Sequence, residues 1–285
     1  MDSSELRKLK VFSAQIRIDT IKILKRKKGG HLGGSLSIVE LLSTLYGKHL
    51  RHDPKNPKWE GRDFLVLSKG HAGPALYSAL ANRGFFDKEK LYTLNEIGTN
   101  LPSHPDRQKT PGVDATTGSL GQGTSQAAGL GYSLRMENSD QRVYLICGDG
   151  ELNEGQVWEA FQFIAHNKLN EVIVFIDNNH MQLDGTLEEI MNPFDIAEKM
   201  RAFGFETWEV DGKDEEAIDK AITEAKLVED KAVAIVLDTV KCQGVEYYYG
   251  RIDNHSPKFA DKENAMLDEV VAGLEDFIAK EDQDV

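Results

Sequence analysis

Uninterrupted apolar runs divide the middle of the chain into short segments typical of buried β-strands. Arg142–Cys147 and Val172–Ile176 are the clearest, and Val233–Asp238 is a third. Strands that are covered on both faces need such continuous runs rather than an alternating pattern. Phe64–Leu67 and Glu206–Val210 have the composition of two further strands. We therefore expect a sheet that is buried on both sides.

Segments with helical composition or spacing alternate with these strands. In Glu154–Asn167, apolar residues recur at the interval that places them on one face of a helix. A first helix is expected from Leu6 to about Lys28, where Gly29 and Gly30 stop it. Together the segments predict an α/β fold, with a mostly parallel sheet and helices on both faces. The remaining helices are expected at Ile38–Tyr46, Ala75–Arg83, Gln126–Met136, Pro193–Ala202 and Glu215–Val228.

The last part of the chain has a different pattern. An apolar stripe at helical spacing runs along it, and the chain ends in the acidic sequence EDQDV. Such a stripe packs on its own domain or on a neighbouring subunit. We expect one large domain in residues 1–258, and a C-terminal amphipathic helix with an acidic tail in residues 259–285. The stripe consists of Leu267, Val270, Val271, Leu274, Phe277 and Ile278.

Composition and charge narrow the class of protein. The chain has 285 residues, of which 40% are hydrophobic, which is enough for a large core. A net charge of −13 argues against nucleic acid or an anionic membrane as a general partner. No apolar run reaches the ~18 residues that a spanning helix needs, and the first residues lack a secretory pattern. We expect a cytoplasmic protein, and its two cysteines provide no disulfide framework.

Two polar motifs follow two of the predicted strands. Gly148-Asp149-Gly150 comes after the first strand, and Asn178-Asn179 comes after the next one. The carboxyl ends of adjacent parallel strands open on one crevice, where open α/β sheets bind ligands. A carboxylate and an amide oxygen are hard ligands for magnesium, which usually shares its coordination with phosphate. Either motif alone is typical of an ordinary turn, but the pair at this spacing predicts a site for magnesium and a diphosphate.

These motifs resemble the thiamin diphosphate signature in the form that the transketolase family has. GDGELNEG followed by DNNHMQLDG carries the resemblance. Further segments agree in the same order along the chain, so that the resemblance extends from about residue 5 to about residue 257. It implies the thiamin-diphosphate-binding fold for residues 1–258, with thiamin diphosphate and Mg²⁺, or Ca²⁺ or Mn²⁺ in its place, as cofactors. The further segments are GGHLGG (Gly29–Gly34), RDFLVLSKGHAGPALYS (Arg62–Ser78), SHPD (Ser103–Asp106) and TTGSLGQG (Thr116–Gly123).

Loop histidines acquire roles only through this resemblance, because a lone loop histidine is more often a surface residue. His71 matches the family histidine that contacts the cofactor's diphosphate. His31 and His104 match histidines that line the substrate channel. His255 matches a later histidine that reaches both the diphosphate and the donor's carbonyl region, although the loop before it differs from the usual form. The resemblance thus implies catalytic roles for His31, His104 and His255.

The resemblance also implies the remaining site residues. Gly118, Ser119 and Leu120 correspond to a stretch that meets the aminopyrimidine and thiazolium, with Ser119 replacing a proline. Glu154 aligns with an acidic residue that the family places at the subunit interface. Its position is explained equally well by an acid that stabilises the start of a helix. The metal ligands implied are Asp149, Asn179 and the backbone carbonyl of Met181, and the other cofactor contacts are Gly150, Glu151 and Asn179.

Transfer of a two-carbon ketol unit is the activity that the resemblance implies. The donor would be a ketose phosphate and the acceptor an aldose phosphate, as in the pentose phosphate pathway. Full-length transketolases continue beyond the point where this chain ends, at Val285, and their second domain supplies the glutamate that activates the cofactor. We therefore expect an N-terminal subunit that is active only with a separate C-terminal subunit, in a heterotetramer of two plus two subunits.

Three alternatives remain open at this stage. One is another two-subunit thiamin diphosphate enzyme that uses a different ketose or starts from pyruvate. A second is the α subunit of a 2-oxo acid dehydrogenase, which would be expected to lack the histidines of KGHAG and SHPD. The third is a cofactor-binding protein that has lost its activity and serves in interactions. Retention of both metal side chains and of the histidines argues against the third.

Overall fold

The core of the molecule is a five-stranded sheet in which every strand is parallel to its neighbours. The computed structural model describes residues 1–283. Along the sheet the strands follow the order β1-β2-β3-β5-β4. The predicted α/β fold with a parallel sheet is confirmed, and the predicted bounds of β1 and β5 agree with the structure. The strands are β1 (Phe64–Leu67), β2 (Val143–Gly148), β3 (Val172–Asn178), β4 (Glu206–Asp211) and β5 (Val233–Asp238).

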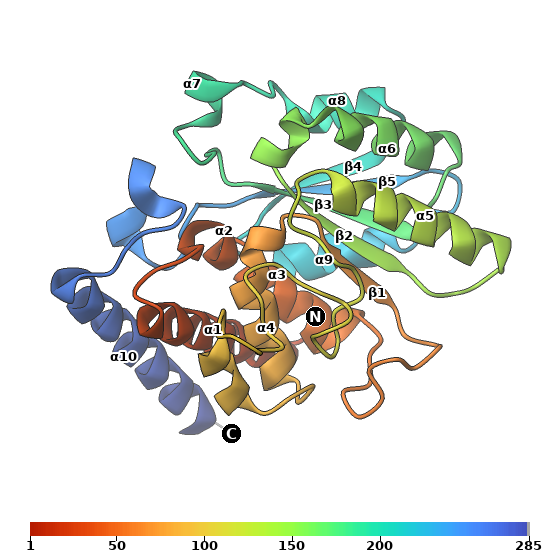
Figure 1. The fold of residues 1–285 in the computed structure, drawn as a ribbon. Coiled ribbons are helices and arrows are strands. Elements are labelled where there is room, and N and C mark those ends of the chain that lie inside the picture. Colours follow the sequence, from red (N-terminus) through yellow and green to blue (C-terminus); the bar gives the residue numbers. More distant parts are fainter. Residues whose placement is uncertain (284–285) are drawn as a thin grey trace.

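Helices cover both faces of this sheet (Figure 1). Successive strand residues point to opposite faces, so Tyr144 and Ile146 join one core while Leu145 and Cys147 join the other. The core on one face contains α5 (Gln122–Met136), α6 (Gly155–His166) and α8 (Ile196–Ala202). The core on the other face contains α1 (Ser3–Arg26), α3 (Val39–Thr44), α4 (Gly73–Asn82), α9 (Glu215–Ala225) and α10 (Asp261–Gln283).

Several helix bounds differ from the predicted ones by one to four residues, and some short helices had no sequence signal. The predicted helix Ile38–Tyr46 is wrong at its end, because α3 stops at Thr44 and a π-helix continues over Leu45–His49. Two short α-helices were missed, α2 (Leu32–Leu36) and α7 (Leu187–Ile190), because neither is long enough to show a period. Short 3₁₀ helices span Gly70–Ala72, Lys88–Thr93, Gly150–Asn153, Glu246–Tyr248 and Ile252–Asn254.

The C-terminal helix α10 packs on the chain's own first helix. Leu267 and Val271 are buried against it, as the apolar stripe predicts. Ion pairs between Lys22 and Glu275 at 2.7 Å, and between Lys25 and Asp268, show that α10 runs antiparallel to α1 (Figure 1). The end of the acidic tail, residues 284 and 285, lies outside the described residues. Within residues 1–283, no helix is both long and apolar enough to cross a membrane.

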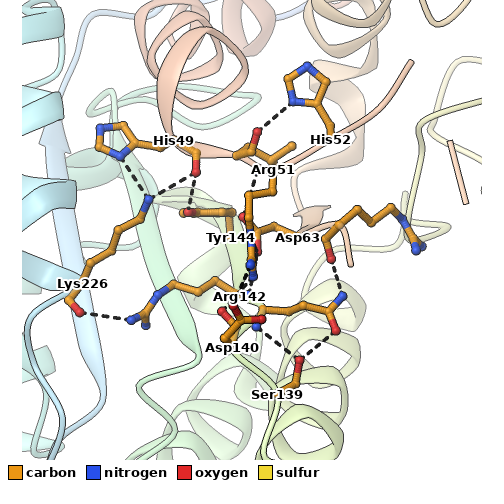
Figure 2. Close-up of polar contacts among 12 residues, drawn as sticks. His49, Arg51, His52, Asp63, Ser139, Asp140, Arg142, Tyr144 and Lys226 are labelled. Carbon is orange, nitrogen blue, oxygen red and sulfur yellow. Dashed lines mark hydrogen bonds and ion pairs between the residues drawn. The ribbon is translucent and has the colours of Figure 1, made fainter. Parts of the chain in front are cut away.

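A polar network fills the amino end of the sheet, opposite the carboxyl ends of the strands (Figure 2). Asp63, just before β1, accepts hydrogen bonds from Arg51 and from the backbone N–H of Arg142. His49 lies beside it on the π-helix, with its ring between Lys226 and Asp219. Lys226 Nζ donates to His49 Nδ1 at 3.1 Å, and His49 Nε2 donates to Asp219 at 2.6 Å. Both ring nitrogens are thus satisfied by the neutral imidazole.

Acid is expected to destabilise the fold through His49. Burial, and secondly the charge of Lys226, lowers the pKa of His49 to about 4 from 6.5. The unfolded chain therefore binds more protons between these two values, so the stability that neutral His49 contributes is lost as pH falls from 6.5 toward 4. Between pH 7 and pH 5 the loss should be about 2 kcal/mol. Urea unfolding at the two pH values measures it.

The matched variant is His49→Gln, which cannot take up a proton in this range. Its loss of stability between pH 7 and pH 5 should be smaller than that of the wild type by about the same 2 kcal/mol. His166→Gln, at an exposed position, should behave like the wild type. Equal pH dependence in the His49 variant and the wild type would rule out this role for His49.

Candidate active site

A cavity of about 270 Å³ lies beyond the carboxyl ends of the central strands. Residues that follow β1, β2, β3 and β5 contribute to its wall, as the parallel arrangement requires. The structure brings most of the predicted site residues to this one wall. They are His31, His71, His104, Gly118, Leu120, Asp149, Gly150, Glu151, Asn179, Met181 and His255.

Asp149 is a buried carboxylate at the end of β2. Its oxygens accept backbone hydrogen bonds from Gly150 at 2.7 Å and from His180 at 2.6 Å. Only 2% of the residue is exposed. Burial, and secondly the charge of Asp177, raises its pKa to about 7. A cation bound at this carboxylate would offset both effects.

Asn179 has its side-chain amide oriented by a neighbouring acid. Its Nδ2 donates to Asp177 Oδ2 at 2.9 Å. The amide oxygen therefore points the other way, where it accepts a 3.3 Å hydrogen bond from the backbone N–H of Met181. Oriented in this manner, the amide presents an oxygen rather than an N–H group to a ligand.

Asp177 forms a buried ion pair with Lys69. Asp177 is 0% exposed and Lys69 is 1% exposed. Ser37 donates to the same carboxylate at 2.7 Å, and Thr239 donates at 2.5 Å. Burial opposes ionisation of Asp177, but the charge of Lys69 and the hydrogen bonds to the carboxylate together outweigh it, so the pKa of the carboxyl is lowered. The pair thus fixes the acid that orients Asn179.

A second lysine, Lys241, enters the cavity from the loop after β5. Its Nζ donates to the backbone oxygen of Gln182 at 2.6 Å. Burial is the main reason that its pKa is lowered to about 8. Lys69 and Lys241 both line the cavity wall. Two lysine cations beside a buried carboxylate suit a ligand with several negative charges, which binds together with a metal ion.

Four histidines form a cluster on the same wall. The ring centroid of His31 lies 5.7 Å from that of His71, 5.8 Å from that of His104 and 5.4 Å from that of His255. His71 and His255 are 5.0 Å apart. Burial, and secondly the nearby lysines, lowers the pKa of His71 well below its usual range and that of His255 to about 3. Burial also lowers the pKa of His31. Near pH 7 these three imidazoles are therefore neutral.

Two predicted residues lie outside this wall. Ser119 and Glu154 are exposed. Glu154 packs near Gly121, where a Cβ added to the glycine would come within 3.2 Å of the glutamate's Cβ. Gly118, in contrast, is required in the wall, because it has a φ of 149° and an added Cβ would lie 3.1 Å from His104 Cγ.

The residues present fit a small divalent cation with a diphosphate. Asp149 supplies a carboxylate, Asn179 supplies an amide oxygen, and Met181 lies next to them on the cavity wall. Hard oxygen ligands of this kind suit Mg²⁺, which keeps further positions for phosphate oxygens. Gly34 leaves the ring of His71 accessible, because a Cβ added there would lie 2.7 Å from its Nε2.

Comparison with known proteins identifies the family. The model of the family described as "Transketolase, thiamine diphosphate binding domain" matches residues 9–276. The chain belongs to the transketolase family. The resemblance carried by the sequence motifs is thereby confirmed, and so is the thiamin-diphosphate-binding fold. The solved structure of a single-residue variant of the transketolase from Pichia stipitis matches with a TM-score of 0.86 at 29% identity. That match covers 99% of this chain but 45% of the Pichia chain.

Two relatives of this transketolase-family chain have a similar length. It is 45% identical over 261 residues to the 6-deoxy-6-sulfo-D-fructose transketolase subunit SqwG of Clostridium sp. (strain MSTE9), covering 91% of this chain and 94% of the relative. It is 35% identical over 242 residues to one subunit of the apulose-4-phosphate transketolase of Phocaeicola vulgatus, covering 85% and 86%. Both relatives are named as transketolase subunits, which agrees with the predicted N-terminal subunit.

The sequence motifs do not identify several residues that shape the cavity. Lys69 and Asp177 belong to segments that carry the resemblance without being predicted site residues, and neither Lys241 nor Gln182 is among those predictions. One signal was available: Lys69 and Lys241 each come within a few residues of the end of an apolar strand, on the side of the sheet where ligands bind. That signal places a residue at the crevice but does not say which way its side chain points.

Proposed function

We propose that this chain is the diphosphate-binding subunit of a two-subunit transketolase. It would transfer a two-carbon ketol unit from a ketose to an aldose, together with a C-terminal subunit that supplies the catalytic glutamate. One observation carries the proposal: a single cavity combines the metal-type oxygens of Asp149 and Asn179 with a cluster of four histidines. The named subunits among the relatives support the division into two chains.

In this proposal, Asp149, Asn179 and the carbonyl of Met181 hold Mg²⁺, and Ca²⁺ or Mn²⁺ would serve as well. His71, Lys69 and Lys241 bind the diphosphate, while Gly118, Ser119 and Leu120 contact the rest of the cofactor. When bound, thiamin diphosphate supplies the carbanion chemistry for breaking and forming the carbon–carbon bond. At the interface, Glu154 would face the other subunit.

His31, His104 and His255 would serve the sugar rather than the cofactor alone. Because His31 and His255 are neutral near pH 7, each can donate an N–H to an oxygen that gains negative charge, or accept a proton from a hydroxyl. The lowered pKa of both rings keeps one nitrogen free to accept. If a ring gives up its N–H proton as its other nitrogen accepts one, it can relay a proton between hydroxyl groups without carrying a full positive charge.

The donor sugar is inferred from the transketolase resemblance and from the names of the two subunit relatives. A pentose phosphate role follows from the transketolase resemblance, but the two subunit relatives are named for other ketoses, 6-deoxy-6-sulfo-D-fructose and apulose 4-phosphate. We propose a donor with an anionic group at the far end of the chain, either phosphate or sulfonate. The sulfonated ketose is the first to test, because the relative named for it is 45% identical.

The deciding experiment is a ketol-transfer assay with the co-purified C-terminal subunit. Xylulose 5-phosphate, 6-deoxy-6-sulfofructose, apulose 4-phosphate and pyruvate are offered as donors, each with an aldose acceptor, at saturating thiamin diphosphate and Mg²⁺. We expect transfer from at least one donor with both subunits and from none with this chain alone. Transfer by this chain alone would contradict the two-subunit proposal, and turnover of pyruvate only would favour a synthase. A heterotetramer of two plus two subunits and a cytoplasmic location remain predictions.

His31→Asn tests the role proposed for the histidine cluster. Asparagine is a favourable residue at the position before a helix, so α2 should form as before. We expect kcat to fall by about 10²–10³, the usual effect of losing a proton-transfer group. The dissociation constant of thiamin diphosphate should stay within about threefold, a change of well under 1 kcal/mol. His166→Asn, on an exposed helix end, is the control. An equal loss of cofactor affinity would instead place His31 against the cofactor.

A further inference from the structure

Glu151 is a buried acid whose carboxylate joins three different segments of the cavity wall. Only 2% of the residue is exposed. Its Oε1 accepts hydrogen bonds from Ser68 Oγ at 2.5 Å and from the backbone N–H of Gly121 at 2.7 Å. Its Oε2 accepts one from the backbone N–H of Gly148 at 3.1 Å. The carboxylate thus contacts the protein on both oxygens.

Each of these donors lies beside residues that the proposed function uses. Ser68 follows β1 directly and precedes Lys69 and His71. Gly121 follows Leu120 and is the N-cap residue of α5. Gly148 ends β2 and precedes Asp149. A displacement of any of the three donors would therefore move a different part of the cofactor cavity.

Two of these segments, the residues after β1 and the residues around the start of α5, approach each other too closely for larger side chains. A Cβ added to Gly123 would lie 2.5 Å from Ser68 Oγ, and one added to Gly70 would lie 2.8 Å from the backbone N of Gly118. Thr117 Oγ1 donates to the backbone oxygen of Leu67 at 2.7 Å. This hydrogen bond joins the end of β1 to the residues before α5 a second time. Backbone contact at these glycines limits how closely the two segments approach, and the hydrogen bonds of Glu151 and Thr117 hold them there.

We propose that Glu151 is a positioning residue, which holds the ends of β1 and β2 and the start of α5 at the spacing that thiamin diphosphate needs. This inference rests on the proposed function. Glu151 would act through Lys69, Leu120 and Asp149, and its carboxylate would not itself have to touch the cofactor. Three donors from three segments satisfy the buried charge, which explains how an acid is tolerated there.

Glu151→Gln is the direct test, since it keeps the shape but turns an N–H group toward one of the donors. Amide hydrogen exchange of the full chain without cofactor should show Gly121 and Gly148 exchanging at least tenfold faster. The dissociation constant of thiamin diphosphate with Mg²⁺, measured by calorimetry on the chain with its co-purified subunit, should rise at least tenfold. Ser68→Ala removes only one of the three donors and should raise the dissociation constant about threefold. This variant tests the same hydrogen bonds if Glu151→Gln does not fold.

Two controls separate positioning from general destabilisation. Val271→Ala removes buried apolar volume on α10, far along the chain from the cavity, and should lower the melting temperature without changing cofactor affinity. Glu229→Gln, an exposed acid, should change neither quantity.

The two measurements can each overturn a different part of the inference. Unchanged exchange at Gly121 and Gly148 would show that the Glu151 hydrogen bonds do not hold these segments. Faster exchange with unchanged affinity would overturn the positioning role. If the wild type with its subunit binds no thiamin diphosphate, the proposed function fails and the positioning role with it, whereas the exchange rates still report on the hydrogen bonds of Glu151.

Discussion

Asp149→Asn is expected to abolish cofactor-dependent activity and, in the same variant, to remove the stabilisation that cofactor binding gives the chain. The carboxylate is 2% exposed and its contacts are the backbone N–H groups of Gly150 and His180. Near its pKa of about 7 the carboxyl is only partly ionised, and an asparagine accepts just one of the two hydrogen bonds, so the chain without cofactor should not gain stability. With the carboxylate gone, Mg²⁺ loses its charged ligand, and ketol transfer should fall at least about a thousandfold.

A ketol-transfer assay with the C-terminal subunit checks the first half of this expectation, and urea unfolding with and without Mg²⁺ and thiamin diphosphate checks the second. The wild type should gain stability when the cofactor is added, as any ligand that binds the folded state requires. The Asp149→Asn chain should show the same free energy of unfolding with and without the cofactor. Asp184→Asn, an exposed acid on the same loop as Asn179, is the matched control and should behave like the wild type. A cofactor response that persists in Asp149→Asn would show that the metal is held elsewhere.

The strands could be predicted because their pattern depends on local sequence. A run such as Val233–Asp238 is apolar at nearly every position, and only a strand covered on both faces makes use of that. The predicted meeting of Asp149 and Asn179 followed from the same reasoning, and the pairing of Gly148 with Asp177 confirms that β2 and β3 are neighbours. Helix positions were also correct where the helices were long.

The features that the sequence could not predict depend on contacts between distant segments. The π-helix at Leu45–His49 turns His49 toward Lys226 and Asp219, both from α9 or the residue after it. No periodic pattern encodes that partnership. The histidine roles likewise came from resemblance rather than from spacing, because ring distances of 5–6 Å between His31 and the other three result from tertiary structure.

The acid–base pattern of the site could be predicted only in part for the same reason. An aspartate after an apolar strand indicates a ligand site, but the pKa of that aspartate depends on Asp177 and on the depth of burial. Lys69 shows the limit most clearly, since a lysine before a glycine in a loop is normally solvated. Only the fold reveals that it is fully buried against Asp177.

Lys69→Met is expected to destabilise the protein by about 3 kcal/mol or more, because it leaves the charge of Asp177 buried without its cation. Asp177→Asn should also destabilise. The double variant Lys69→Met/Asp177→Asn should recover most of the loss, since neutral groups of similar size replace both ions. Urea unfolding of the four proteins gives the coupling energy, which we expect to exceed about 2 kcal/mol. The exposed pair Lys231–Glu206, at 2.9 Å, is the matched control, and its coupling should stay below about 1 kcal/mol.

The double variant also shows why a costly ion pair would be retained. Asp177 accepts the hydrogen bond that turns the amide oxygen of Asn179 away from it, and an asparagine at 177 could offer an N–H there instead. We therefore expect the double variant to be nearly as stable as the wild type yet to bind thiamin diphosphate with Mg²⁺ at least about tenfold more weakly, a change of about 1.4 kcal/mol. Both the loosened amide of Asn179 and the loss of the Lys69 cation from the diphosphate site would contribute. Calorimetric titration measures the affinity. Wild-type affinity in a stable double variant would mean that the ion pair serves the fold alone, and that Asn179 is oriented by other contacts.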